Sequence, residues 1–224
     1  MRRAAPAALG APRRGRRALL VGLAAGGLQG WSLPACAGAQ VEEPLADAVR
    51  SALSAAVSDL APPRPGFERI EDRLAYLRWL GTMSERLKPR KNDHRTRVEF
   101  LETLWYESKR AGLEPALVLG LVQVESGFRK YAISLAGARG YMQVMPFWAR
   151  LIGDGDALRL FHLQTNLRFG CVILRHYLDQ ERGDAFLALG RYNGSRGRAE
   201  YPNAVFVART RWLPPVDVRD PAVV

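Results

Sequence analysis

Apolar residues recur every three or four positions along much of the chain, which is the spacing of an α-helix with one buried face. The first three such segments hold Leu45, Val49, Leu53, Ala56 and Leu60 within residues 44–60; Ile70, Leu74 and Leu77 before a stop near Pro89; and Val98, Leu101 and Trp105 before a stop at Gly112. Prolines and a glycine at positions 62–66 interrupt the chain after the first helix and predict a linker.

Residues 116–125 are apolar around nearly the whole helix, with Gln123 as the only polar side chain before Glu125. A helix of this kind is typical of the middle of a core. Shorter helices are expected near 146–152 and at 163–182, 184–192 and 203–212, with a loop of small residues over 127–140. Because no alternating run is long enough for a confident strand, the sequence predicts a mainly α fold.

The composition narrows the class of protein. The 224 residues, 48% of them hydrophobic, suit one core-forming domain with an accessory segment. Two cysteines exclude a disulfide-stapled miniprotein and a cysteine-based zinc site. His94, His162 and His176 are scattered and indicate surface or packing positions. We therefore expect neither a metal nor a cofactor.

The first 39 residues have the pattern of an export signal. They contain six arginines and no Asp, Glu or Lys, and the apolar stretch 18–28 follows the arginines. Ala37-Gly38-Ala39 then provides a cleavage site before Gln40. The apolar stretch is too short to span a bilayer. The pattern predicts a cleaved signal peptide and a periplasmic mature protein.

Two features leave the export route open. Arg16-Arg17 fits a twin-arginine signal as well as a general secretory one. The string Leu33-Pro34-Ala35-Cys36 is similar to a lipoprotein box, although its proline fits poorly. Membrane anchoring is therefore expected only if Cys36 is lipidated, which would give an outer-membrane lipoprotein.

The net charge of +11 looks at first like a nucleic-acid signature. Removal of the six signal arginines leaves 27 basic and 22 acidic residues, a net charge of +5. A run of basic residues between Arg86 and Arg97 is interpreted as a solvated loop or as a contact for an anionic polymer. Since the protein is predicted to be exported, we do not expect a nucleic-acid partner.

Glu125 is the candidate for chemistry. It ends the apolar run of residues 116–125, where a charged carboxylate would be poorly solvated. Desolvation and the negative end of the helix dipole both raise a carboxyl pKa. A carboxyl that keeps its proton near neutral pH can act as a general acid. The alternative is a solvent-facing residue at a helix end.

Several strings around Glu125 together resemble one known family. They are Glu125-Ser126-Gly127-Phe128, Ser134, Gly137-Ala138-Arg139-Gly140-Tyr141-Met142-Gln143-Val144-Met145-Pro146 and Tyr192-Asn193. In this order they resemble the soluble lytic transglycosylases, the goose-lysozyme-like glycoside hydrolase family 23. The resemblance runs from about Arg95 to Trp212. It implies a lysozyme-like helical domain of the goose type with a cleft, preceded by an accessory N-terminal helical segment.

The resemblance also implies a role for each matched residue. Glu125 would be the single catalytic acid and base, and peptidoglycan glycan strands the substrate. The remaining roles are sugar contacts for Ser134, Gln143 and Met145, a hydrogen bond from Tyr192 that orients the glutamate, and a turn held by Asn193. The family's usual Tyr-Asn-Ala-Gly is Tyr192-Asn193-Gly194-Ser195 here, which affects the loop but removes no reacting group.

Three functions follow from these residues. Most glycosidases use two carboxyl groups, but residues 125–146 offer only Glu125, which favours a lytic transglycosylase that forms 1,6-anhydromuramoyl products. A hydrolytic muramidase would need Asp154 or Asp156 to face Glu125. A non-catalytic cell-wall-binding module is the third possibility. The expected organisation is a signal peptide at 1–39, a helix and linker at 40–66, the lysozyme-like domain at 67–213 and a tail at 214–224.

Overall fold

The computed structural model describes residues 40–58 and 66–214. The predicted signal peptide with Cys36, most of the linker and residues 215–224 of the tail lie outside the described residues. The helices are α1 (Asp47–Ser58), α2 (Ile70–Leu87), α3 (His94–Arg110), α4 (Pro115–Glu125), α5 (Pro146–Ile152), the 3₁₀ helix η1 (Ala157–Phe161), α6 (Leu163–Gln180), α7 (Ala185–Asn193) and α8 (Glu200–Thr210).

The mainly α fold predicted from the sequence is confirmed. Within residues 40–58 and 66–214, β pairing is limited to two isolated bridges, which join Arg139 to Ile133 and to Val144. The predicted helices are all present within a few residues of their expected bounds, and η1 was not predicted. None of the helices in these two ranges is long and apolar enough to cross a membrane.

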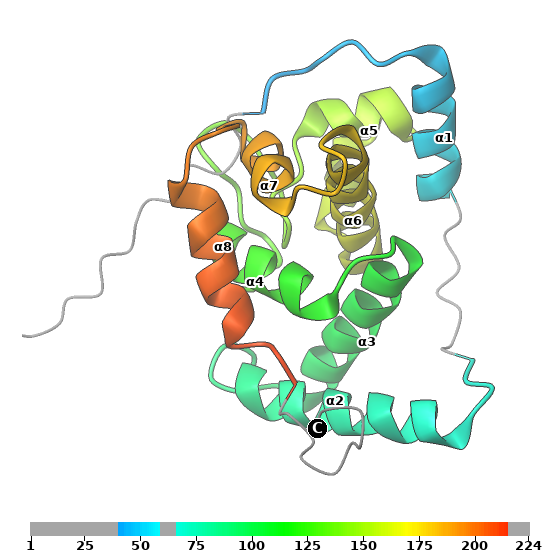
Figure 1. The fold of residues 1–224 in the computed structure, drawn as a ribbon, viewed down its shortest axis with the longest axis vertical. Coiled ribbons are helices and arrows are strands. Elements are labelled where there is room, and N and C mark those ends of the chain that lie inside the picture. The colour runs from blue at the N-terminus through cyan, green and yellow to red at the C-terminus, as the bar shows by residue number, and fades with distance from the viewer. Residues whose placement is uncertain (1–39, 59–65, 215–224) are drawn as a thin grey trace, which may run out of the picture. The chain divides into compact units, whose positions relative to one another are not determined.

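Helix α4 lies at the centre of the helices, with α8 on one side and α3 on the other (Figure 1). Its residues from Val118 to Val122 are all buried, as its all-round apolar sequence predicts. Pro115 at the first position starts the helix without losing a backbone hydrogen bond. The helix therefore carries Glu125, its last residue, out of the middle of the core.

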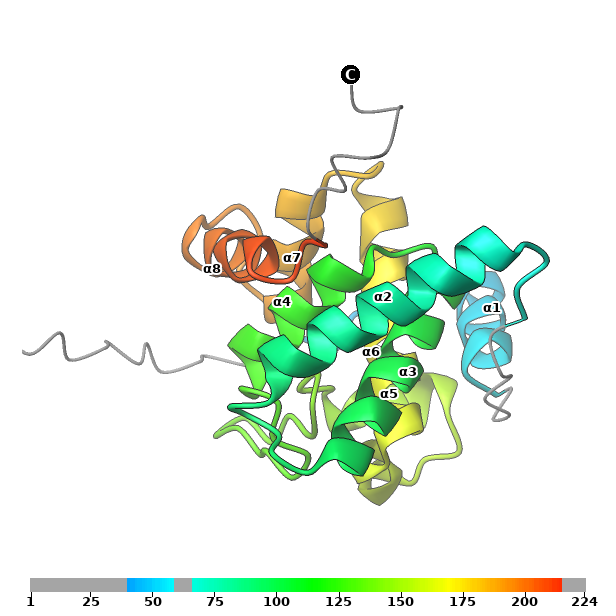
Figure 2. The same cartoon turned by 90° about the horizontal axis from the view of Figure 1, so that it is seen from below.

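A close backbone contact joins α4 to α8. A Cβ atom at Gly120 would lie 2.7 Å from the Arg209 nitrogen and 2.9 Å from the Val205 oxygen. Only glycine allows this approach, because both neighbours are backbone atoms of α8. Figure 2 shows the two helices side by side from a second direction. The contact sets where the first turn of α8 lies relative to the end of α4.

A buried ion pair links α3 to α6. The Arg168 guanidinium donates to Glu107 Oε1 at 2.8 Å, and both side chains are only 1% exposed. Breaking such a pair leaves an uncompensated charge in the core, which costs about 3–5 kcal/mol. The pair therefore fixes these two helices against each other.

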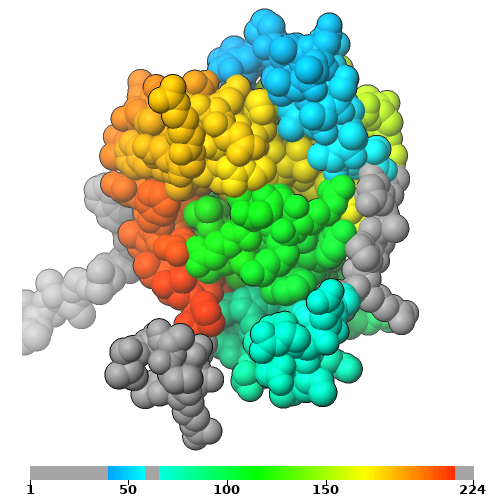
Figure 3. Space-filling model, turned by 45° about the vertical axis from the view of Figure 1, so that its right-hand side comes forward, coloured from blue at the N-terminus to red at the C-terminus, as the bar shows by residue number. Residues whose placement is uncertain are grey.

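Helix α2 forms where predicted but buries a different face. Ile70, Leu74 and Leu77, whose spacing indicated the helix, are 74%, 48% and 49% exposed. The buried side carries Tyr76 and Met83 instead, and the Tyr76 ring contacts the rings of Phe67 and Trp105. The sequence pattern identified the helix correctly, but aromatic packing against α3 decided its orientation. Figure 3 shows α3 exposed between α2 and the end of α6.

Candidate active site

Glu125 is buried at the C-terminal end of α4, with 5% of its surface exposed. Its Oε1 accepts a hydrogen bond from the Tyr201 hydroxyl of α8. Its Oε2 is buried and has no hydrogen-bond partner among the described residues. The two carboxyl oxygens are therefore chemically distinct.

Burial raises the pKa of Glu125 from 4.5 to about 8, and the hydrogen bond from Tyr201 opposes part of this rise. The direction is the one that its apolar surroundings predict. At neutral pH the carboxyl is protonated. Because Oε1 already accepts a hydrogen bond from the Tyr201 hydroxyl, we place the carboxyl proton on Oε2. The Glu125 carboxyl thus carries a proton that makes no hydrogen bond to any of the described residues.

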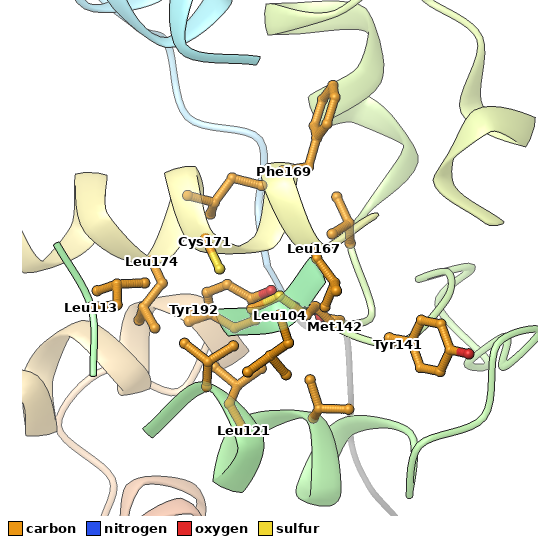
Figure 4. Close-up of a cluster of buried hydrophobic side chains, with 14 of the residues drawn as sticks. Leu104, Leu113, Leu121, Tyr141, Met142, Leu167, Phe169, Cys171, Leu174 and Tyr192 are labelled. Atoms are coloured by element: carbon orange, nitrogen blue, oxygen red, sulfur yellow. Dashed lines mark hydrogen bonds between the residues drawn. The ribbon is translucent and has the colours of Figure 1, made fainter. Parts of the chain in front are cut away.

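The tyrosine beside Glu125 is Tyr201, which is a correction to the sequence prediction. The hydroxyl of Tyr192, expected to bond Glu125, donates to the Met142 carbonyl oxygen at 2.8 Å. Its ring lies in the hydrophobic cluster between α6 and α4, next to the Met142 side chain (Figure 4). The core packing of this ring directs its hydroxyl to the 141–145 loop.

Sequence reasoning missed Tyr201 because its contact with Glu125 spans 76 positions. The local sequence Glu200-Tyr201-Pro202 gives only a helix start. The signal lies in the packing of α8 on α4 at Gly120, which brings the first turn of α8 to the end of α4. No periodicity in one sequence encodes that approach.

The loop that follows Arg139 is held in place beside Glu125 by three side chains. Ser126 Oγ donates to the Tyr141 carbonyl oxygen at 2.7 Å, directly next to the glutamate. Asn166 of α6 accepts from the Met142 nitrogen at 2.8 Å and donates to the Arg139 carbonyl oxygen at 2.8 Å. With the bond from Tyr192, these contacts give the loop a fixed path.

Gln143 lies within this loop and helps to shape it. The residue is buried and has a φ angle of 50°, a left-handed conformation that non-glycine residues rarely adopt. Its Nε2 donates to the carbonyl oxygens of Gly140 and Ala132, at 3.0 and 3.1 Å. Such strain is often found at functional sites, where the surrounding contacts hold it.

The other predicted site residues occupy the surrounding loops. Ser134 is half-buried in the segment just before Arg139, where its Oγ accepts from the Ala138 nitrogen at 3.1 Å. Met145 is partly buried at the start of α5. Asn193 donates to Ser195 Oγ at 3.0 Å across a turn in which Gly194 has a φ of 76°. This bond spans the turn that follows α7.

Asp154 and Asp156 are the candidates for a second carboxylate. Both make their hydrogen bonds within the turn that leads into η1. Asp154 Oδ1 accepts from the Asp156 nitrogen at 3.1 Å, and its other oxygen pairs with Arg159. Asp156 caps η1 by accepting from the Leu158 nitrogen at 2.9 Å. Both line a pocket of about 350 Å³ beside α1, and Glu125 is not among its lining residues. Neither aspartate faces Glu125.

Part of the chain is similar to known proteins. Residues 103–206 match the family described as "Transglycosylase SLT domain". The "Transglycosylase" of Enterobacteria phage PRD1 is 35% identical over 104 residues, which cover 46% of this chain and 38% of that protein. The "Membrane-bound lytic murein transglycosylase C" of Actinobacillus pleuropneumoniae serotype 5b is 37% identical over 90 residues, 37% of this chain and 25% of that protein. The chain thus spans well under half the length of these relatives.

A solved structure is also similar. It is the lytic transglycosylase Slt of Pseudomonas aeruginosa, with a TM-score of 0.41 and 23% identity. The matched region covers 63% of this chain and 27% of that one.

Proposed function

We propose that the protein is a peptidoglycan lytic transglycosylase, because its residues 103–206 match the family described as "Transglycosylase SLT domain". It would cleave the β-1,4 bond between N-acetylmuramic acid and N-acetylglucosamine and leave a 1,6-anhydromuramoyl end. The observation that carries the proposal is the protonated, buried carboxyl of Glu125 with a free Oε2.

In the first step Glu125 Oε2 donates its proton to the glycosidic oxygen. The bond from that oxygen to C1 of the muramoyl residue breaks, and the glucosamine residue leaves with a neutral 4-hydroxyl. The substrate's own N-acetyl group stabilises the oxocarbenium-like C1, since neither Asp154 nor Asp156 faces Glu125. Substrate-assisted chemistry of this kind needs only one enzymatic carboxyl.

In the second step the Glu125 carboxylate takes the proton of the muramoyl 6-hydroxyl, and the 6-oxygen bonds to C1. This closes the 1,6-anhydro ring, consumes no water and returns Glu125 to its protonated state. Burial drives the return, because it raises the pKa of Glu125 to about 8 and disfavours the free carboxylate. The resting acid is therefore regenerated within each turnover.

The neighbouring residues have supporting roles in this proposal. Tyr201 keeps Oε1 occupied and so directs the reactive proton to Oε2. Gln143, Ser134 and Met145 would contact the bound sugar, and Tyr192 and Asn193 would position the adjoining loops. We place the enzyme in the periplasm on the basis of its predicted export signal.

Mass spectrometry of the muropeptides released from purified peptidoglycan tests the proposal. We expect products that end in anhydromuramic acid, and no release by the Glu125→Gln variant at unchanged fold. Products with a reducing-end muramic acid, heavier by one water, would identify a hydrolytic muramidase instead. Binding to sacculi without any soluble product would identify a wall-binding module.

A further inference from the structure

A surface beside the proposed active site combines cations with aromatic rings. Arg90, Lys91, Lys130 and Arg139 each lie 4.8–5.6 Å from the centre of a ring that they cover. The rings belong to Phe100, Phe128, Tyr131, Tyr141 and Phe161. All five cation–π contacts found in residues 40–58 and 66–214 belong to this set, which we call the cationic surface.

The rings form two connected groups that carry the cations. Phe100 contacts both Phe128 and Tyr141, with ring centres 5.8 and 4.8 Å apart. Tyr131 contacts Phe161 at 5.9 Å. The turn after α2 supplies Arg90 and Lys91 and lies beside the 127–141 loop (Figure 2), and Lys91 Nζ donates to the Tyr141 hydroxyl at 2.8 Å. The two groups are carried by the same 127–141 loop, apart from Phe100 of α3 and Phe161 of η1.

The charge of the cationic surface is not neutralised by the described part of the chain. None of its four cations forms an ion pair with a described carboxylate. Burial lowers the pKa of Lys91, and the positive charge of Lys130 lowers it further. Burial and, after it, the Glu99 carboxylate raise the pKa of Tyr141. An aromatic face holds a cation in position but leaves it able to bind an anion.

The cationic surface adjoins the catalytic residue. The Tyr141 carbonyl oxygen accepts from Ser126 Oγ, and Ser126 directly follows Glu125. The Phe128 backbone lies two residues further along the same turn, and Tyr131 is 70% exposed. A polymer that places a sugar bond at Glu125 would therefore bring its substituents to these side chains.

We propose that the cationic surface binds the carboxylates of the peptide stems of peptidoglycan and makes the enzyme prefer glycan strands that carry them. The inference rests on the proposed function, because it takes peptidoglycan as the substrate. Peptide stems are the anionic groups that peptidoglycan carries along its whole length. The exposed ring of Tyr131 and the half-buried ring of Phe161, each beside a cation, suit a peptide with both charged and apolar parts.

The basic run between Arg86 and Arg97 is divided by the fold, which supports this assignment. Arg97 is buried, and its guanidinium donates to Ser84 Oγ and to the carbonyl oxygens of Lys91 and Asn92. Arg86 donates to the carbonyl oxygens of Arg211 and Leu213. Both serve the fold, so a binding role falls to the residues at the turn rather than to the run as a whole.

The test compares intact peptidoglycan with glycan strands from which an amidase has removed the stems. The double variant Lys130→Gln/Arg139→Gln removes two charges, and Arg73→Gln/Arg78→Gln removes two exposed charges on α2 as the matched control. We expect the first variant to lose roughly fivefold in kcat/KM on intact peptidoglycan relative to stem-free strands, since each exposed ion pair contributes a few-fold. The control should keep the wild-type ratio between the two substrates.

Sedimentation with sacculi gives a second readout that does not need turnover. In the Glu125→Gln background, the Lys130/Arg139 variant should bind intact sacculi more weakly and stem-free sacculi as before, with the difference lost at high salt. A failed proposed function would show as no anhydro product from wild type, whatever the binding result. Equal losses on both substrates, no loss on either, or stem-independent binding to phosphatidylglycerol vesicles or duplex DNA through these residues would overturn the inference.

Discussion

The buried carboxyl of Glu125 should destabilise the fold at neutral pH. Replacing it tests whether Glu125 holds a proton at that pH. The pKa of Glu125 is about 8 in the folded protein against an ordinary value of 4.5. Between these two pH values the unfolded chain has released a proton that the folded chain still holds. Stability therefore falls as pH rises through this window, by about 1.4 kcal/mol per pH unit.

The Glu125→Gln variant removes this dependence while it keeps the shape of the side chain. The amide oxygen can still accept from Tyr201, and the amide nitrogen takes the place of the protonated Oε2. The variant should be more stable than wild type by about 3 kcal/mol at pH 7 and about 5 kcal/mol well above pH 8, with little difference below pH 4.5. These stability differences are order-of-magnitude values that follow from the rise in the pKa of Glu125 from 4.5 to about 8.

Urea unfolding at intervals from pH 4.5 to pH 9 measures the difference. The control Glu68→Gln removes an exposed carboxyl and should follow the wild-type curve. If the curves of wild type and Glu125→Gln run parallel over the whole range, Glu125 is not protonated at neutral pH. The acid role proposed for it would then be lost, together with its regeneration step.

Three further predictions follow from the same packing. Gly120→Ala should cost about 1–3 kcal/mol by forcing α8 off α4, whereas Gly81→Ala, whose new Cβ meets nothing within 4 Å, should gain stability in denaturant unfolding. Tyr201→Phe removes the bond that lowers the pKa of Glu125, so the alkaline limb of the kcat/KM profile should move to higher pH; an unmoved limb contradicts that role. Arg168→Met should cost about 3–5 kcal/mol in equilibrium unfolding, because it leaves the buried Glu107 carboxylate with only a 3.9 Å ion pair to Arg110.

The core position of α4 and the desolvation of Glu125 could be predicted from the sequence for one reason. An all-round apolar run has no face to give to solvent, so residues 116–125 had to lie in the core. A carboxyl at the end of such a run is desolvated whichever elements surround it. The raised pKa of Glu125 follows from that local fact alone.

The buried face of α2 and the hydrogen-bond donor to Glu125 could not be predicted from the sequence in the same way. The apolar positions Ile70 and Leu74 are exposed because the ring of Tyr76 packs against Trp105 and rotates the other face inward. Tyr192 has the family's motif around it, yet Tyr201 donates to Glu125. Both outcomes depend on contacts between segments far apart in the chain.

The sequence by itself determined the helices, the central position of α4 and the presence of a proton-holding carboxyl at its end, because each depends on residues within a few turns of one another. Only the tertiary structure decided which tyrosine meets Glu125, that the two aspartates face away, and that cations from two segments each lie over an aromatic ring. These arrangements arise from close packing between helices, such as that allowed by Gly120, and a one-dimensional pattern of polar and apolar residues does not specify which surfaces meet.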